Sequence, residues 1–210
     1  QEPSSQKPDS LAAVPQVPEG AADLDPVELA KAMNATMLLA APGPQHEKFA
    51  AREGYYAVEM ALTPPGVPAQ TFAGEARAMT VLGGRYLLVN LRVKLAGVML
   101  EGLYLFGFDN LRQHYTMSWR DSMSTWAVEC AGKLPETDPD RVPLQGVLVD
   151  AASPTGRPFE VVLQFRDDGL EVAVQDKVKD AQVQVMTQRF VKKPDPRAAA
   201  PGASEAKPGT

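Results

Sequence analysis

The chain has 210 residues, of which 44% are hydrophobic and 22% charged, so most of it can fold around a core. Its formal net charge of −5 argues against a nucleic-acid-binding protein, which needs a basic face. A single cysteine excludes an internal disulfide and a zinc site built from thiolates, and no run of about 18 apolar residues is present that could span a membrane.

Proline is concentrated at the two ends of the chain. Residues 1–24 and 194–210 combine proline with serine, glycine and alanine and have little apolar density, so we expect a disordered leader and a disordered tail. A single folded domain is then expected over residues 25–193. The first residue is Gln1 rather than methionine, and we interpret this polar start as a processed N-terminus, which predicts a periplasmic or secreted protein.

Two helices are predicted at the start of the domain. Asp25 is a suitable N-cap residue and Pro26 suits the first turn of a helix whose apolar residues recur every three or four positions to Ala41. Proline and glycine at positions 42 and 43 end that helix. Pro44 then begins a shorter helix through Phe49.

From residue 55 onward the apolar residues recur with a period of two, which is typical of strands with one buried and one solvated face. The clearest case is 85–95, where Leu87, Val89 and Leu91 share one face. Turn residues separate ten such segments, which we place at 55–62, 69–82, 85–96, 98–107, 112–121, 124–133, 142–150, 157–166, 170–177 and 181–191.

The predicted fold class is all-β, an antiparallel up-and-down barrel of about ten strands. Short turns between consecutive strands imply antiparallel neighbours, and closure into a barrel removes the exposed edges of so large a sheet. One or two N-terminal helices would close one end of the barrel. A β-sandwich is the competing architecture.

Four groups of residues resemble the DUF1579 family of uncharacterised proteins. The first is Gly43-Pro44-Gln45-His46, followed by Gly54-Tyr55-Tyr56, where Tyr56 stands in place of the tryptophan usual in the family. The others are Gly83-Gly84-Arg85 before a strand, Glu101-Gly102 with Gly107-Phe108-Asp109, and Tyr115 with Trp119, Asp121 and Ser122. The resemblance covers 43–192 and implies a lipocalin-like, or calycin, barrel.

The resemblance also assigns structural roles. It implies that Gly54, Gly83 and Gly84 shape the turns and that Tyr56 packs against an arginine of the last strand, here Arg189. A hairpin that needs positive φ is also the simplest explanation of the paired glycines, because no nucleotide-binding motif surrounds them.

Several side chains are candidates for ligand contact. Arg85, Glu101 and Asp121 each follow the phase of neighbouring apolar residues, which places charges on the predicted inner face of the barrel. They would either cap the barrel ends or form a polar patch that orients a ligand, and Glu101 with Asp121 would permit acid–base chemistry if they met. His46 is placed beside the barrel mouth by the resemblance, and Tyr115 and Trp119 belong to the aromatic residues that could line a cavity.

The sequence favours a binding module over other functions. An apolar small molecule inside the barrel is the first hypothesis; an enzyme using the same polar patch, and a structural or interaction protein with a packed interior, are the alternatives. His46 and His114 give no paired signal for haem, and Cys130 follows the phase of a buried strand without a base beside it. We therefore expect no cofactor and no metal, and assign no catalytic residue.

Overall fold

The structure is a computed structural model that describes residues 25–151, 153–178 and 181–196. The expected leader, and residues 197–210 of the expected tail, lie outside the described residues. The chain divides into two compact units at residues 40 and 41. In the first unit, helix α1 (Pro26–Leu39) begins after Asp25, whose carboxylate accepts the N–H of Val27, and none of its residues is buried. Within the described ranges, every helix is too short or too polar to cross a bilayer.

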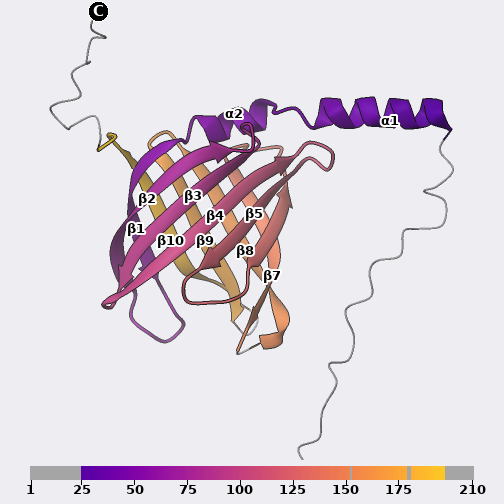
Figure 1. Cartoon of the computed structure of the whole chain (residues 1–210). Coiled ribbons are helices and arrows are strands. Elements are labelled where there is room, and N and C mark those ends of the chain that lie inside the picture. Colours follow the sequence, from indigo (N-terminus) through magenta and orange to yellow (C-terminus); the bar gives the residue numbers. More distant parts are fainter. Residues whose placement is uncertain (1–24, 152, 179–180, 197–210) are drawn as a thin grey trace, which may run out of the picture. The chain divides into compact units, whose positions relative to one another are not determined.

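The second unit is a closed barrel of ten antiparallel strands, as the sequence predicts (Figure 1). Each strand pairs with the next along the chain, and the last pairs with the first. Short helix α2 (Pro44–Ala50) precedes the barrel. The strands are β1 (Gly54–Leu62), β2 (Gln70–Val81), β3 (Tyr86–Leu95), β4 (Val98–Asp109), β5 (His114–Asp121), β6 (Val128–Lys133), β7 (Arg141–Asp150), β8 (Ser153–Arg166), β9 (Gly169–Val178) and β10 (Ala181–Lys193).

Turn geometry sets which residues of each strand face inward. A two-residue turn joins β3 to β4 and pairs Leu95 with Val98 and Arg92 with Glu101. Paired residues lie on the same face of a sheet, so odd-numbered residues face inward on β3 and even-numbered residues face inward on β4. The prediction that Glu101 lies on the inner face is therefore wrong: its side chain is on the outer face, opposite Arg92.

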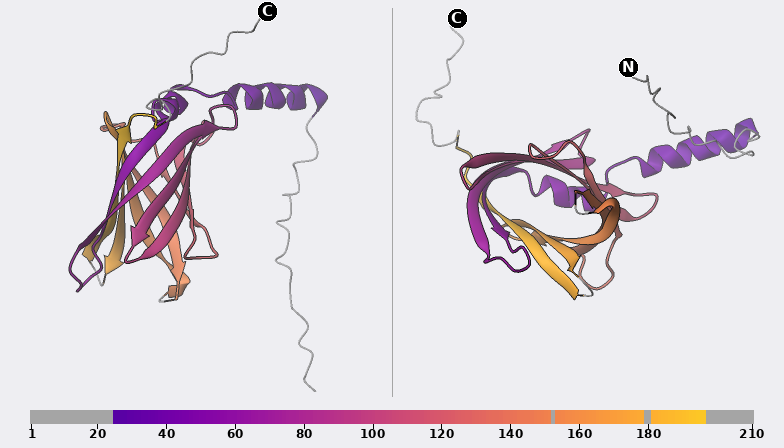
Figure 2. Two further views of the ribbon diagram at one scale, coloured as in Figure 1. Left: turned by 60° about the vertical axis from the view of Figure 1, so that its left-hand side comes forward. Right: turned by 90° about the horizontal axis from the view of Figure 1, so that it is seen from below.

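Aromatic rings fill the half of the barrel that lies beside α2. The ring of Phe49 on α2 lies 6.2 Å from the ring of Tyr115 and 6.3 Å from that of Phe165, measured between centroids. Phe108 adds a further ring 4.9 Å from Tyr115. Viewed along the barrel, α2 lies across the far opening (Figure 2). We call this the α2 end and the opposite opening the open end.

His46 fixes α2 to the end of β4. Its Nδ1 accepts the N–H of Gly43 at 3.0 Å, and the ring is also hydrogen-bonded to the backbone of Phe108. The side chain is only 5% exposed. A ring that accepts at Nδ1 is neutral there, so the geometry requires unprotonated histidine.

We expect the free energy of unfolding to fall when the pH is lowered through the range where His46 protonates. Burial lowers the pKa of His46 below its ordinary 6.5, and the positive charge of Arg85 acts in the same direction. The unfolded chain binds this proton at a higher pH than the folded chain does. The contribution of His46 is thus fully present above pH 6.5 and is lost as the pH falls through the lower pKa of the folded state.

Urea unfolding at a series of pH values from about 8 down to about 5 measures this dependence. The His46→Gln variant should lose less stability over that range than the wild-type chain. His114→Gln serves as the control for the loss of an imidazole, because His114 is only half-buried on the outer face of β5. Equal slopes for His46→Gln and the wild type would contradict the assignment.

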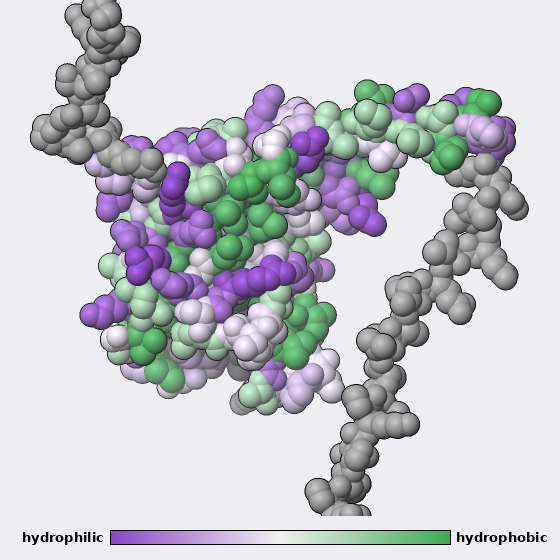
Figure 3. All heavy atoms as spheres, in the orientation of Figure 1, coloured by the Kyte–Doolittle hydropathy of each residue, from purple (hydrophilic) through white to green (hydrophobic). Residues whose placement is uncertain are grey.

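The outer wall of the barrel is partly apolar. Figure 3 shows apolar residues gathered on the upper part of the face that Figure 1 presents. Outward positions on β3 and β4 include Leu88 and its cross-strand partner Leu105, both half-buried, and Leu103. Outward aliphatic residues blur the alternation of apolar and polar residues along these strands. They are compatible with a barrel, because much of any protein surface is apolar.

Candidate functional site

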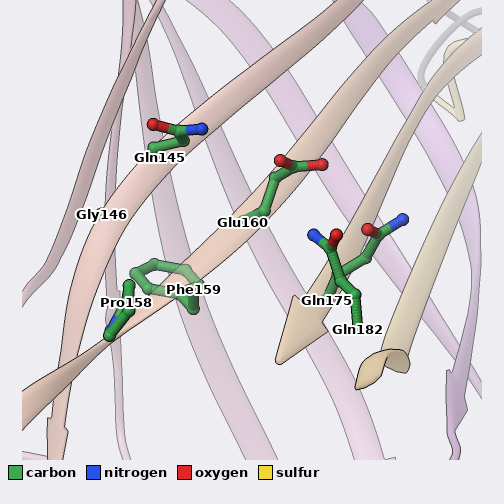
Figure 4. A pocket seen from close by; sticks show the side chains of 7 residues that line it. All are labelled: Gln145, Gly146, Pro158, Phe159, Glu160, Gln175 and Gln182. Atoms are coloured by element: carbon green, nitrogen blue, oxygen red, sulfur yellow. The ribbon is translucent and has the colours of Figure 1, made fainter. Parts of the chain in front are cut away.

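Two hollows are the principal candidates for a site, and they differ in where they lie. The larger, about 500 Å³, is on the outer wall of β7 to β9, where outward-facing Gln145, Glu160 and Gln175 stand in one cross-strand row (Figure 4). These polar side chains are at least partly exposed and belong to a solvated face of the sheet. This outer groove therefore has the character of ordinary barrel surface.

The second hollow, which we call the open-end cavity, lies inside the barrel and has a volume of about 290 Å³. Inward-facing residues of β4 to β10 and the loop 122–127 form its wall. Its wall is mainly aromatic, aliphatic and thioether side chains, with two carboxylates and two hydroxyl groups. They are Tyr104, Met117, Trp119, Asp121, Met123, Ser124, Trp126, Val128, Leu148, Asp150, Phe159, Val161, Val174 and Met186.

Trp119 and Asp121 form the best-defined part of the cavity wall. Successive inward positions at the end of β5 carry them, and the indole Nε1–H of Trp119 donates to Oδ2 of Asp121 at 2.7 Å. The other carboxylate oxygen accepts the N–H of Met123 at 2.8 Å, which anchors the loop 122–127 at the rim. The indole lies over Gly102 of β4, where a β-carbon would stand 2.0 Å from the ring. Glycine at this position therefore makes room for the indole.

Tyr104 of the wall forms a buried polar pair with Gln188. The Tyr104 hydroxyl donates to Oε1 of Gln188 at 2.9 Å, and both side chains are almost fully buried. The Gln188 amide nitrogen contacts the sulfur of Met186 at 3.5 Å. Burial raises the pKa of Tyr104, and the negative charge of Asp121 adds to that shift, so the phenol stays protonated.

Three charged side chains form a cluster at the rim. Arg157 donates from Nη1 to Asp150 at 2.8 Å, and from Nε and Nη2 to Asp176 at 3.0 and 2.8 Å. Oδ1 of Asp150 also accepts the N–H of Ser153. One guanidinium is thus shared by two carboxylates, and the cluster keeps a net negative charge.

Cys130 lies on the inner face of β6 and is 6% exposed. Burial raises the pKa of its thiol to about 12, so no thiolate forms at neutral pH. The side chain is therefore a small buried hydrophobic group, in line with the sequence interpretation.

The structure brings two of the six predicted ligand-contact residues to the cavity, Trp119 and Asp121. Tyr115 is buried at the α2 end, where its hydroxyl bonds with Gln45. His46 is buried beside it on α2, away from the open-end cavity.

The other two are on the outside, and here the sequence interpretation is wrong. Arg85 was predicted to face inward with Leu87, but β3 begins one residue later, at Tyr86. Arg85 therefore lies in the exposed turn before β3, where it donates to the carbonyl of Leu82. The Glu101 carboxylate lies 3.3 Å from Arg92 on the outer face, with its side chain 62% exposed. An acid–base pair of Glu101 with Asp121 is therefore not formed.

Of the structural roles that the resemblance implies, those of the glycines are found in the structure and the pairing of Tyr56 with Arg189 is not. Gly83 and Gly84 have φ of 68° and 82°, and Gly54 has φ of 142°, so these turns use backbone conformations that glycine favours. The implied pair of Tyr56 with Arg189 is not present: Arg189 faces outward and pairs with Asp168 at 3.1 Å. The hydroxyl of Tyr56 instead donates to the carbonyl of Arg52, just after α2.

The sequence analysis did not single out Asp150, Arg157, Asp176 or Gln188. Each lies on an inward position of its strand, between or beside apolar residues. The same criterion that pointed to Asp121, a polar residue in phase with a buried face, would have found them.

Within residues 25–151, 153–178 and 181–196, no group of three or more His, Cys, Asp or Glu side chains is arranged to hold a metal ion. The polar groups of the cavity can accept hydrogen bonds and attract positive charge. Among the described residues of the wall, Ser124 is the one aliphatic hydroxyl, and it bonds to the backbone of Trp126 and not to a base.

Comparison with known proteins identifies a family and a related fold. Residues 41–192 match the model of DUF1579, described as a protein of unknown function. Comparison with the curated proteins finds no significant match. Among solved structures, the crystal structure of Rv2717c from M. tuberculosis is similar with a TM-score of 0.54 and 10% sequence identity, over 73% of this chain and 100% of that one. At this identity the likeness concerns the fold alone.

Proposed function

The chain belongs to the DUF1579 family of proteins of unknown function, and we propose that it binds a small, largely apolar molecule in the open-end cavity. The observation that carries the proposal is the uneven filling of the barrel. Aromatic rings pack the α2 end, whereas about 290 Å³ is left at the open end behind a rim formed by the loop 122–127.

The composition of the wall supports this role. Ligand sites are mostly apolar with a few polar groups that orient the ligand, and their volumes begin at about 300 Å³. The wall of the open-end cavity follows that pattern, with Asp121 and Asp150 as its charged groups among the described residues. An engineered cavity of about 150 Å³ binds benzene, so the space here, about twice as large and open on one side, suits a body of two or three aromatic rings.

Filling the cavity should abolish binding. Titration with N-phenyl-1-naphthylamine, a neutral probe whose fluorescence rises in apolar surroundings, should give a saturable signal with the wild-type chain. Val174→Phe places a ring in the cavity and should weaken binding at least about tenfold, which corresponds to about 1.4 kcal/mol.

The matched control is Val147→Phe, the same substitution on the outer face of β7, where the side chain is 60% exposed. It should bind the probe as the wild type does. Circular dichroism of all three proteins checks that the barrel is intact. Absence of a signal with the wild type, or equal binding by Val174→Phe, would overturn the proposal.

An interaction protein is the second candidate, and α1 supports it. Its apolar side chains include Val27, Met33 and Leu38, which are 60%, 60% and 79% exposed. Uncovered apolar surface of this kind is typical of contact sites for other proteins. The probe titration separates the two candidates, because a contact role for α1 does not require the probe to enter the barrel.

A further inference from the structure

We propose that the ligand of the open-end cavity carries a positively charged, ammonium-type head on its apolar body and that Asp121 is the group that pairs with this head. The inference rests on the proposed function and specifies the chemical class of the ligand. It follows from the charge of the wall, the unused hydrogen-bonding capacity of Asp121 and the nature of the surrounding side chains.

The wall of the cavity is acidic. Of the described residues that line it, the charged ones are Asp121 and Asp150. The nearby cation, Arg157, is already held by Asp150 and Asp176 through hydrogen bonds of 2.8 to 3.1 Å. A ligand with a carboxylate head would meet like charges and would find, among the described residues of the wall, no cationic side chain to replace its lost hydration.

The carboxylate of Asp121 can accept more hydrogen bonds than the protein gives it. One oxygen accepts from the indole of Trp119 and the other from the N–H of Met123. Each carboxylate oxygen offers about two lone-pair positions, so one position per oxygen remains for a donor in the cavity. The two protein bonds hold the group in place, which reduces the ordering cost of binding.

The side chains around Asp121 also favour a cation. The indole of Trp119 lies against Tyr104, with ring centroids 4.2 Å apart, and Trp126 stands at the rim with 48% of its surface exposed. Aromatic faces attract an ammonium group by about 0.5–2 kcal/mol. Met117 and Met186 supply polarisable apolar surface for the body of the ligand.

The test is a competition between two ligands of similar shape and opposite charge. 2-Naphthylmethylamine is positively charged at neutral pH, and 2-naphthaleneacetate, the anion of 2-naphthaleneacetic acid, is negatively charged. Each is titrated against bound N-phenyl-1-naphthylamine at low ionic strength. The amine should displace the probe at a concentration at least about tenfold lower than the carboxylate does, and added salt should reduce the difference.

Two variants assign the preference to one residue. Asp121→Asn keeps the shape of the side chain but removes its charge, and it should bring the amine and the carboxylate within about threefold of each other. Asp167→Asn removes one negative charge from the exposed turn at the α2 end and should keep the wild-type preference. Loss of the preference in both variants would overturn the role of Asp121.

The outcomes separate the two proposals. If the neutral probe binds but the amine and the carboxylate displace it equally, the cavity binds ligands and the charge inference is wrong. If the carboxylate displaces it better, the inference is also wrong. If the neutral probe does not bind at all, the proposed function itself fails. The wild-type comparison stands on its own if Asp121→Asn does not fold.

Discussion

Replacing Phe49 by alanine should lower the free energy of unfolding by about 3–5 kcal/mol, the range for truncating a fully buried phenylalanine. Phe49 is 0% exposed and is one of the two buried residues of α2. Its ring meets Tyr115 and Phe165 inside the barrel, so its loss opens a void among aromatic rings and removes one of the two buried side chains that attach α2 to the barrel. Urea unfolding followed by circular dichroism measures the loss.

Glu47→Ala is the matched control for Phe49. It makes an alanine substitution on the same helix at an exposed position and should change the stability by less than about 0.5 kcal/mol. A loss below about 1 kcal/mol for Phe49→Ala would mean that α2 contributes little to the stability of the barrel. Probe binding at the open end should survive the substitution under conditions where the protein stays folded.

Replacing Gly102 by alanine should displace the indole of Trp119 and weaken probe binding at least about tenfold. An added β-carbon would lie 2.0 Å from the ring, closer than any real contact, so the indole must leave its place and its bond to Asp121. The clash should also cost about 1–3 kcal/mol of stability. The chain has two tryptophans, so the Trp126→Phe substitution leaves Trp119 as the one source of indole fluorescence. In that background, a change in emission on adding Gly102→Ala reports the movement of the Trp119 indole.

A double-mutant cycle checks that the indole is the cause. Trp119→Leu removes the ring, so Gly102→Ala should be much less destabilising in that background than in the wild-type chain. Additive losses of stability would show that the added methyl group disturbs β4 itself. Unchanged emission and binding in the single variant would contradict the position of the indole against Gly102.

The sequence predicted about ten antiparallel strands and both helices, and it favoured a closed barrel over the competing β-sandwich, which the structure confirms. Alternation of apolar residues is local, and turn residues mark where one strand ends and the next begins, so neither required knowledge of distant contacts. The starts of both helices were also predicted, since Asp25 stands directly before α1 and Pro44 is the first residue of α2, whereas α1 ends at Leu39 and not at the predicted Ala41.

The site was only partly predictable, and Glu101 shows why. Odd-numbered residues face inward on β3, and the prediction assumed that odd-numbered residues, Glu101 among them, also face inward on β4. The two-residue turn at Ala96 and Gly97 reverses that phase, as its pairing of Leu95 with Val98 shows. Sequence alternation gives the faces of one strand, whereas the turn decides which face of the next strand joins them.

The cavity itself could not be predicted from a pattern. Whether a barrel is filled depends on the summed volume of inward side chains from all strands and on what covers each end. The position of Trp126 at the rim is a related case, because it lies in the loop before β6 and not within that strand. Such contacts depend on the path of a loop, which apolar periodicity does not report.

On the proposed function, the uneven filling of the barrel places the contacts that keep the protein folded and the contacts that would select a ligand at opposite ends. Large aromatic contacts lie at the α2 end, while the rim contributes short loops and half-exposed side chains. Substitutions at the rim can therefore change the size and charge of an accepted molecule at little risk to folding. On the proposed function, a scaffold organised in this way can be adapted to chemically unrelated compounds without rebuilding its packed end.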